Sequence, residues 1–281
     1  QISSRDWGLM VIDEVQEMPA ETFRTCISIA KAHTKLGLTA TLVREDTKIT
    51  DLNYLIGPKL YEANWIDLSE QGYIARVQCF EVWCKMPGPF FRAYYQSSAQ
   101  PGKQRILSAM NPEKFTTCER LIRYHEARGD KILVFSDIIW VLKKYAALFH
   151  GDIVYGGTPE KERNVLFAKY RNSTKGTTLF ISRIGDKAID LPDARVLIQI
   201  SSHFGARMQE AQRLGRILRP KAGKSGEFNA FFYTLISEDT REMFFSSKRQ
   251  QFLVDQGYAF EVIQNQSERW PLDPSKMTFS T

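Results

Sequence analysis

Two carboxylates near the start of the chain are the residues best placed to do chemistry. The apolar segment Leu9–Ile12 has the composition of a buried strand, and Asp13 and Glu14 follow it directly. Open α/β sheets bind their ligands at the carboxyl ends of the strands. In nucleotide hydrolases the first such acid holds Mg²⁺ through water, and the second can polarise the attacking water. The pair therefore indicates phosphoryl transfer, with Asp13 as the metal ligand.

A group of arginines near the other end of the chain could complete such a site. Arg213, Arg216 and Arg219 repeat every three residues after Gln212, so a helix would keep them on one flank. Arginines beside a γ-phosphate neutralise charge that develops during transfer. A basic stripe with this spacing is usually a solvated helix face, but its position after an apolar strand favours the catalytic interpretation. Acids first and arginines last is the order of a two-lobed, nucleic-acid-driven ATPase.

A pair of hydroxyls supports the interpretation of the acids. Thr39 and Thr41 lie at the end of the next expected strand, Leu36–Thr41. Because parallel strands end at one edge of their sheet, these hydroxyls should lie beside the acids and relay hydrogen bonds. A solvated strand end is the alternative for the acids alone, and the threonines weaken it.

Two turns in the second half of the chain could bind phosphates or a nucleotide. Gly156 and Gly157 lie between a strand and a helix, where backbone N–H groups can approach a phosphate. An ordinary capped turn is the simpler alternative for them. Ser182 and Gly185 could contact phosphates through their backbone, and Asp190 could accept a ribose hydroxyl or an opposing arginine.

An aromatic cluster interrupts the rhythm of strands and helices between two Pro-Gly turns. It occupies positions i, i+1, i+4 and i+5, a spacing that suits either a small local core or a gripping element whose rings stack on bases. Basic residues follow it closely. The members are the aromatics Phe90, Phe91, Tyr94 and Tyr95 and the cations Lys103 and Arg105.

Composition narrows the class of protein. The net charge of +6 and the pI of about 9.0 lean towards a polyanionic partner. No apolar run approaches membrane-spanning length, so we expect no membrane partner. The four cysteines form no CxxC pair, which favours reduced thiols in an intracellular protein over a metal site or disulfides.

Apolar segments alternate with helical patterns, so the fold class is α/β with a mainly parallel sheet flanked by helices. We expect a partial first domain over 1–80, a complete second domain over 81–265 and a loose tail over 266–281. The expected strands are Leu9–Ile12, Leu36–Thr41, Val77–Cys84, Ile132–Phe135, Ile153–Tyr155, Thr178–Ile181, Val196–Ile200 and Phe228–Leu235. The expected helices are Ala20–Ala32, Asp46–Ile56, a helix from Asn111-Pro112 to near Gly129, Ile138–Phe149, one opened by Thr158-Pro159, Gly205–Leu218 and Asp239–Gln256.

Taken in order, these blocks resemble helicase superfamily 2 and, within it, the XPB family of the transcription and repair factor TFIIH. The resemblance runs from Trp7 to about Ile263 and implies two RecA-like lobes. It implies ATP and Mg²⁺ bound between the lobes, translocation along double-stranded DNA in the nucleus, and other TFIIH subunits and repair factors as partners. The segments that carry it are Lys35–Thr47, Asp51–Trp65, Gly72–Cys84, Leu197–His203, Glu210–Arg219 and Lys248–Tyr258.

The resemblance also implies roles for individual residues. Those of the acid block are Asp13, Glu14 and Gln16, and those of the coupling block are Thr39 and Thr41. The motif implicated in DNA unwinding is Arg44-Glu45-Asp46, and a thumb-like insertion spans about 87–110. The last motif supplies Gln212 together with Arg216 and Arg219 as arginine fingers.

Three departures from the family pattern bear on activity. Position 16 is Gln where the family usually has His, and Gln can hydrogen-bond but cannot carry a proton charge. No GxxxxGK[ST] phosphate loop occurs, and the damage-recognition region is absent. We therefore expect a fragment of a longer polypeptide that is inactive alone. The rival interpretation is a non-catalytic paralogue or scaffold that binds DNA or TFIIH partners without turnover.

Overall fold

The structure is a computed structural model. It describes residues 3–13, 15, 25–26, 29–39, 56–63, 65–182, 194–201, 228–255 and 258–264. The chain divides into two compact units, and the larger begins at Trp65. This division falls earlier than residue 80, because strand β3 (Val77–Cys84) lies whole within the sheet of the larger unit.

Among its described residues, the smaller unit contains two parallel strands. Strand β1 (Trp7–Ile12) pairs with β2 (Ala32–Gly37), in a register that matches Ile12 with Gly37. The prediction of a strand over 36–41 is wrong in its bounds, since the pairing begins four residues earlier. The apolar letters of that stretch suggested a strand, whereas the paired segment is largely polar and exposed. The helix expected over 20–32 cannot reach its last residue, where β2 begins, and most of the helix expected over 46–56 lies outside the described residues.

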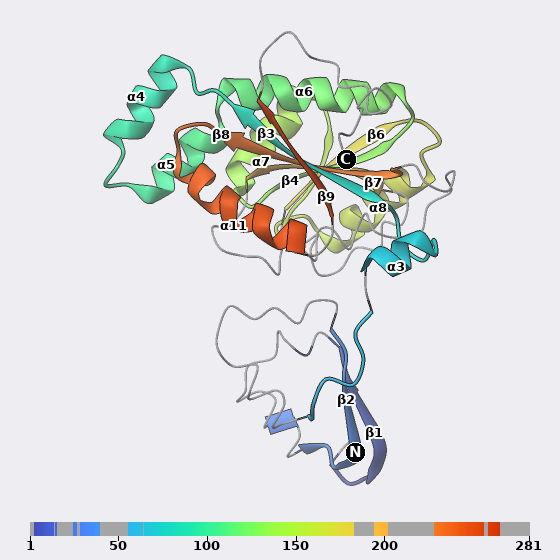
Figure 1. The fold of residues 1–281 in the computed structure, drawn as a ribbon. Coiled ribbons are helices and arrows are strands. Elements are labelled where there is room, and N and C mark those ends of the chain that lie inside the picture. The colour runs from blue at the N-terminus through green and yellow to red at the C-terminus, as the bar shows by residue number, and fades with distance from the viewer. Residues whose placement is uncertain are drawn as a thin grey trace. The chain divides into compact units, whose positions relative to one another are not determined.

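The larger unit is built on a seven-stranded sheet in the order β5-β6-β4-β7-β8-β3-β9, and all its strand pairs are parallel (Figure 1). Its strands are rich in β-branched and aromatic residues, which suit a sheet buried on both faces. Besides β3 they are β4 (Lys131–Ser136), β5 (Asp152–Val154), β6 (Thr177–Ile181), β7 (Ala194–Ser201), β8 (Ala230–Ser237) and β9 (Ala259–Gln264).

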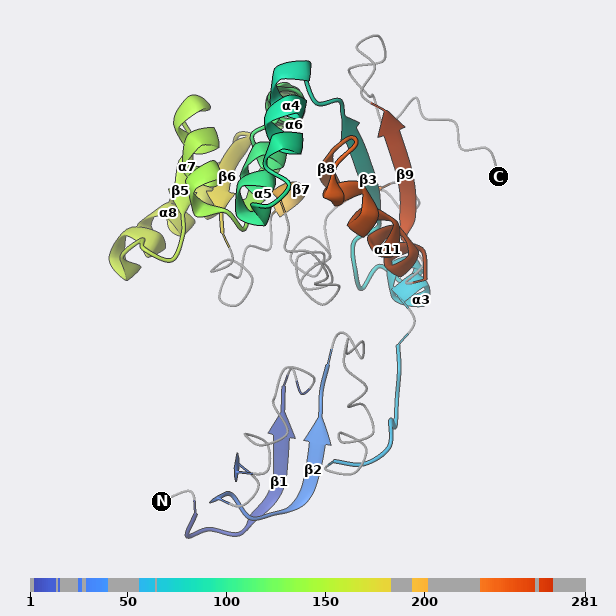
Figure 2. The same ribbon diagram turned by 90° about the vertical axis from the view of Figure 1, so that its left-hand side faces the viewer.

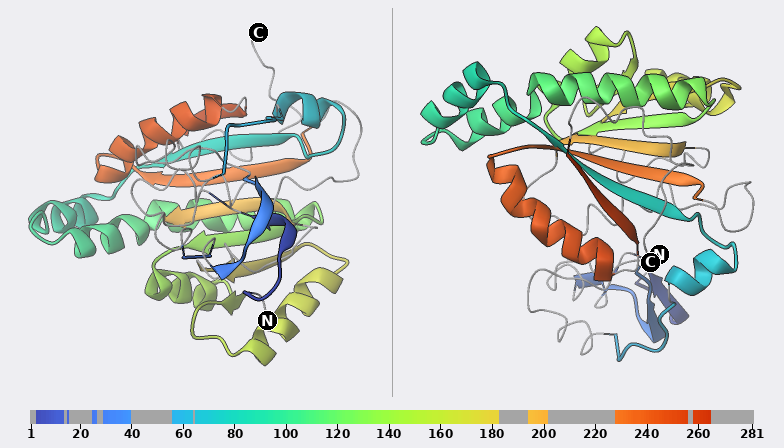
Figure 3. Two further views of the ribbon diagram at one scale, coloured as in Figure 1. Left: turned by 90° about the horizontal axis from the view of Figure 1, so that it is seen from below. Right: turned by 45° about the horizontal axis from the view of Figure 1, so that its top comes forward.

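Helices cover both faces of this sheet. Helices α6 (Pro112–Ala127) and α7 (Ile139–Leu148) pack on one face, where the alternate strand residues form the main hydrophobic core. Helix α11 (Arg241–Asp255) lies on the other side of the strands, as the right-hand view of Figure 3 shows. Figure 2 shows α11 running beside β3 and β9. Helix α8 (Glu160–Asn172) joins β5 to β6.

Three helices and one strand were not expected from the sequence. The stretch that breaks the βα rhythm forms two short helices, α4 (Gly88–Gln96) and α5 (Pro101–Ala109), each begun by a proline at its first turn. Helix α3 (Trp65–Glu70) and strand β9 complete the list. The helix expected over 205–218 and the tail from 266 lie outside the described residues. Within the described ranges, no helix is both long and apolar enough to cross a membrane.

Candidate functional site

The first candidate position is the carboxyl edge of β1 and β2. Backbone pairing continues beyond both strands, because the Leu38 N–H donates to the Ile12 oxygen at 2.8 Å and the Val15 N–H donates to the Leu38 oxygen at 3.1 Å. Asp13 and Thr39 therefore follow neighbouring strands at the same edge, as expected. Asp13 is exposed and Thr39 is half-buried. An exposed carboxylate suits a Mg²⁺ ion held through water.

The second position is the glycine turn after β5. The Thr158 side chain accepts from the Tyr155 N–H at 3.1 Å, and the Thr158 N–H donates to the Tyr155 oxygen at 2.9 Å. A Cβ at Gly157 would lie 2.7 Å from the Tyr155 ring, so a larger residue there would have to displace that ring. Gly156 and Gly157 are both exposed. The turn is thus a capped turn whose open side remains available to a phosphate.

Ser182 lies next to this turn. It follows β6, and its N–H donates to the Val154 oxygen at the end of β5 at 3.1 Å. Its side chain is buried. The structure therefore brings Ser182 and the Gly156-Gly157 turn to one edge of the sheet. The backbone N–H of Ser182, however, already donates a hydrogen bond within the fold.

The aromatic cluster on α4 divides between core and surface. Tyr94 is buried, and its hydroxyl accepts from the Arg241 N–H at 3.0 Å. Phe90 and Phe91 are half-buried, whereas Tyr95 is 73% exposed. Only part of the cluster can therefore serve as a stacking surface, and Tyr95 is its most accessible ring.

The two cations expected beside this cluster differ in their surroundings. Lys103 is exposed on α5. Arg105 donates from its Nη2 to the Asp137 Oδ2 at 2.5 Å, and the Asp137 side chain is only 1% exposed. Lys103 can thus meet a phosphate freely, while Arg105 is already paired with a buried carboxylate.

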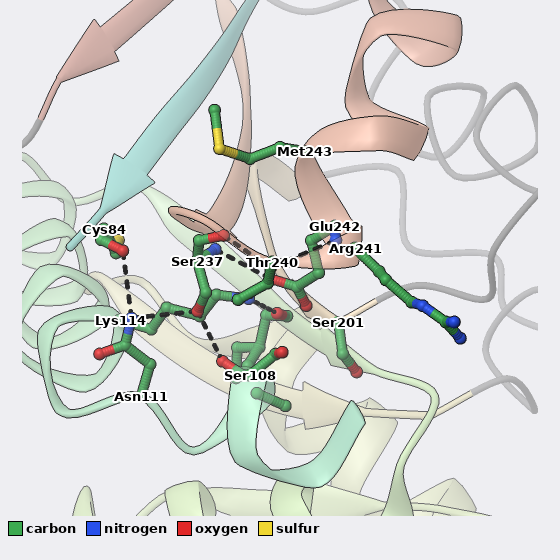
Figure 4. A network of polar contacts seen from close by, with 12 residues as sticks. Cys84, Ser108, Asn111, Lys114, Ser201, Ser237, Thr240, Arg241, Glu242 and Met243 are labelled. Atoms are coloured by element: carbon green, nitrogen blue, oxygen red, sulfur yellow. Dashed lines mark hydrogen bonds and ion pairs between the residues drawn. The ribbon is translucent and has the colours of Figure 1, made fainter. Parts of the chain in front are cut away.

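A network of buried polar groups lies at the carboxyl edge of the seven-stranded sheet (Figure 4). At its centre the Lys114 side chain is 0% exposed. Its ammonium donates to Glu242 Oε2 at 2.6 Å and to the Ile200 oxygen at 3.0 Å. The same Glu242 oxygen accepts from the Ser237 N–H at 2.8 Å. The pair therefore joins α6, the start of α11, and the ends of β7 and β8.

Asn111 extends this network to α5 and β3. Its Nδ2 donates to the Cys84 oxygen at 3.1 Å and to the Ser237 Oγ at 3.0 Å. The Ser237 hydroxyl then donates to the Ser108 oxygen at 2.8 Å. Burial raises the pKa of the Cys84 thiol to about 12, although nearby Lys114 lowers it. Cys84 is therefore an inert thiol in the core and not a nucleophile.

From the sequence, Asn111 was predicted only as the start of a helix, and Lys114, Glu242, Ser237 and Asp137 were not singled out. Lys114 has the charge of a solvated helix residue, and Asp137 of an ordinary loop residue, so composition gives no signal for burial. Several expected site residues lie outside the described residues. They are Glu14, Gln16, Thr41, Arg44, Glu45, Asp46, Gly185, Asp190, Gln212, Arg216 and Arg219.

A comparison of folds relates the chain to a DNA-processing enzyme. An ATP-dependent Type ISP restriction-modification enzyme, LlaBIII, solved bound to DNA, matches 92% of this chain with a TM-score of 0.66. The match covers 22% of that enzyme at 12% sequence identity. The likeness therefore concerns the fold alone.

Sequence comparison is far more specific. The chain is 56% identical over 94% of its length to the "General transcription and DNA repair factor IIH helicase/translocase subunit XPB" of Dictyostelium discoideum. It is 56% identical over 93% of its length to the XPB/SSL2 subunit of Saccharomyces cerevisiae. These matches cover 33% and 31% of the two relatives, so the chain spans about a third of their length. The model of the ERCC3/RAD25/XPB C-terminal helicase matches residues 68–280. The chain therefore belongs to the ERCC3/RAD25/XPB C-terminal helicase family.

Proposed function

We propose that this chain is part of an ATP-dependent translocase that moves along double-stranded DNA. The activity opens DNA during transcription initiation and nucleotide excision repair in the nucleus, together with other subunits of transcription factor IIH. The observation that supports this most is the 56% identity, over 94% of the chain, to a relative named as an XPB helicase/translocase subunit.

The residues assigned to hydrolysis are consistent with this proposal. Asp13 would hold the Mg²⁺ of bound ATP through water, and Glu14 would polarise the attacking water. Thr39 would relay hydrogen bonds from the same sheet edge. Arg216 and Arg219 would stabilise charge on the transferring phosphoryl group.

The rival proposal is a non-catalytic paralogue or scaffold. Gln16 favours it, because a Gln side chain cannot carry a proton charge. The presence of both acids and both arginines opposes it, since binding alone requires neither group. Turnover by the full-length protein distinguishes the two.

The decisive experiment measures ATP hydrolysis by the full-length protein with and without duplex DNA. Arg216→Ala or Arg219→Ala should lower turnover by about 10²–10⁴-fold, a range that overlaps the roughly 10³–10⁵-fold effect of arginine fingers in other enzymes. ATP affinity should weaken much less, because the charge that they meet grows in the transition state.

Arg213→Ala is the matched control, since it removes a neighbouring arginine to which the family pattern assigns no finger role. Turnover close to wild type is expected for it. Equal losses in ATP affinity and turnover for the finger variants would make them ordinary binding residues. A full-length wild-type protein without any turnover would favour the scaffold. The chain 1–281 alone should show no DNA-stimulated turnover, because its sequence has no GxxxxGK[ST] loop to cradle the β- and γ-phosphates.

A further inference from the structure

The last two residues of β7 are held from two directions. The Ile200 oxygen accepts from the buried Lys114 ammonium at 3.0 Å. The Ser201 hydroxyl donates to Asp137 Oδ1 at 2.7 Å and shares a second hydrogen bond of 2.8 Å with the Ser136 hydroxyl. Along the chain, the segment with the proposed arginine fingers comes next. Ser201 is therefore the last described residue before that segment.

Asp137 links this strand end to the α4–α5 insertion. One of its oxygens accepts from Ser201, and the other accepts from the Arg105 guanidinium on α5 at 2.5 Å. The Asp137 side chain is 1% exposed and the Arg105 side chain 27%. Charge-assisted bonds between such groups are stronger than neutral ones, and loss of the cation would leave a buried carboxylate unpaired. A movement of α5 therefore changes the surroundings of Ser201.

The α4–α5 insertion exposes groups that suit a nucleic acid, and polar contacts help to join it to the rest of the unit. Its outer surface carries the exposed Tyr95 ring and the exposed Lys103 ammonium. Among its contacts with the body of the unit are polar ones, from the Tyr94 hydroxyl to the Arg241 N–H and from Arg105 to Asp137. Such contacts depend steeply on distance and angle.

We propose that Arg105, Asp137 and Ser201 form a relay from the DNA-contacting insertion to the end of β7, so that Arg105 is a positioning residue for hydrolysis. Duplex DNA bound by the outer face of α4 and α5 shifts α5, and the ion pair transmits this shift to Ser201. The relay rests on the proposed function, since it assigns the step by which DNA stimulates turnover.

The test separates DNA affinity from turnover in the full-length protein. Affinity for a fluorescent duplex is measured by anisotropy, and ATP hydrolysis is measured against duplex concentration. Arg105→Ala should leave the Kd for DNA within about twofold while lowering kcat at saturating DNA about tenfold, which corresponds to ~1.4 kcal/mol of activation free energy. Arg105→Lys keeps the charge and should restore part of the loss.

Lys103→Ala is the matched control on the same helix. Because Lys103 is exposed, its removal should raise the Kd for DNA and lower the salt slope of binding by about one unit. At saturating DNA, the kcat of Lys103→Ala should therefore be close to that of the wild type. Opposite behaviour of two cations only two positions apart cannot come from general loss of positive charge.

The third variant, Ser201→Ala, removes a single hydroxyl and should reproduce the kcat loss with unchanged DNA affinity. The double variant Arg105→Ala/Ser201→Ala should be no worse than either single variant, because both break one relay. Thermal unfolding of each variant shows that the fold is retained, and Ser201→Ala carries the test if Arg105→Ala is unstable.

Two results would overturn the relay while leaving the proposed function intact. One is an Arg105→Ala protein whose DNA affinity falls and whose kcat at saturation is retained, since Arg105 would then be a direct DNA contact. The other is an additive loss of kcat in the double variant. A wild-type protein without DNA-stimulated turnover would remove the proposed function itself, and the relay with it.

Discussion

The buried side chain of His125 links the end of α6 to Asp130, just before β4, and to Tyr233 on β8. His125 Nδ1 lies 2.8 Å from Asp130 Oδ2, and Nε2 lies 3.0 Å from the Tyr233 hydroxyl. Burial raises the pKa of Asp130, but the bond to His125 and nearby Arg128 outweigh it and the net pKa is lowered. An ionised Asp130 can only accept, so Nδ1–H donates to it and Nε2 accepts from Tyr233.

This arrangement predicts a pH dependence of stability. Burial lowers the pKa of His125 below its ordinary 6.5, despite the opposing effect of Asp130. Above pH 6.5 the imidazole is neutral in the folded and the unfolded chain, and its full contribution is present. As the pH falls through 6.5, the unfolded chain gains a proton that the folded one resists, so the free energy of unfolding decreases.

His125→Gln isolates this contribution, because Gln can donate to Asp130 and accept from Tyr233 without titrating. Urea unfolding of the chain at pH 8.0, 6.5 and 5.0 (about one to two units on either side of an ordinary histidine pKa) provides the measurement. The advantage of the wild type over His125→Gln should shrink as the pH falls. A constant difference at all three values would mean that the pKa of His125 is the same in the folded and the unfolded chain.

The buried Lys114–Glu242 pair leads to a second prediction for single residues. Lys114→Met should lower the free energy of unfolding by about 3–5 kcal/mol, because it leaves a carboxylate without its cation. Lys114→Met/Glu242→Gln should recover much of this loss, since the Gln oxygen still accepts from the Ser237 N–H. Chemical denaturation of both variants measures it.

An exposed ion pair on the same helix is the control. Arg123 Nη2 lies 2.6 Å from Glu119 Oε1, and the Arg123 side chain is 77% exposed. Arg123→Met should change the stability by less than about 1 kcal/mol. Similar losses for Lys114→Met and Arg123→Met would show that burial does not govern the energy of the Lys114 pair.

At the level of elements, the sequence was most informative where a periodic apolar pattern and a helix-start signal occur together. Helix α6 was expected from Asn111-Pro112 to near Gly129, and it spans Pro112–Ala127 with Asn111 as its cap. Strand β3 has the bounds expected from its apolar and aromatic composition. Helix α3 was not predicted, because its six residues are too few to show a helical period. Strand β9 was not predicted, because its partner β3 lies about 180 residues earlier in the chain.

The candidate site could be predicted only in part for the same reason. The glycine turn and the Asp13 edge depend on neighbouring residues and known strand-end geometry. The Lys114–Glu242 pair joins residues 128 apart, and Asn111–Ser237 joins residues 126 apart. Nothing local in the sequence indicates that these side chains meet, since their meeting depends on the order of the strands.

The prediction at the level of elements concerns Asn111, the cap of α6. Asn111 is buried, its Oδ1 accepts from the Glu113 N–H at 3.0 Å, and its amide donates to β3 and β8. Asn111→Ala should therefore lower stability by about 2–4 kcal/mol, more than the ~1 kcal/mol typical of a cap alone. Asn111→Asp keeps the cap acceptor but loses both donors. If Asn111→Asp were as stable as the wild type in urea unfolding, the amide bonds would contribute nothing.

At the level of the whole molecule, the two units differ in how completely their sheets are covered. Helices cover both faces of the seven-stranded sheet, as parallel sheets require. In the described part of the smaller unit the sheet has two strands, and on β1 the alternate residues Leu9 and Val11 are 53% and 51% exposed. Apolar side chains in a parallel pair normally face other elements of a domain. Two strands alone bury too little surface for independent stability.

This difference predicts two classes of hydrogen exchange in the chain 1–281. Backbone amides of β4, β7 and β8 should exchange slowly, close to the limit set by global unfolding, because their strands lie in the interior of the sheet. Amides of β1 and β2 should exchange much faster, through local opening. Mass spectrometry of peptides after deuterium labelling measures both in one sample. In the full-length protein, β1 should gain protection if further elements cover Leu9 and Val11, while β4, β7 and β8 should change little. Equal protection of all these strands in 1–281 would show that the two-stranded pair is stable as it stands.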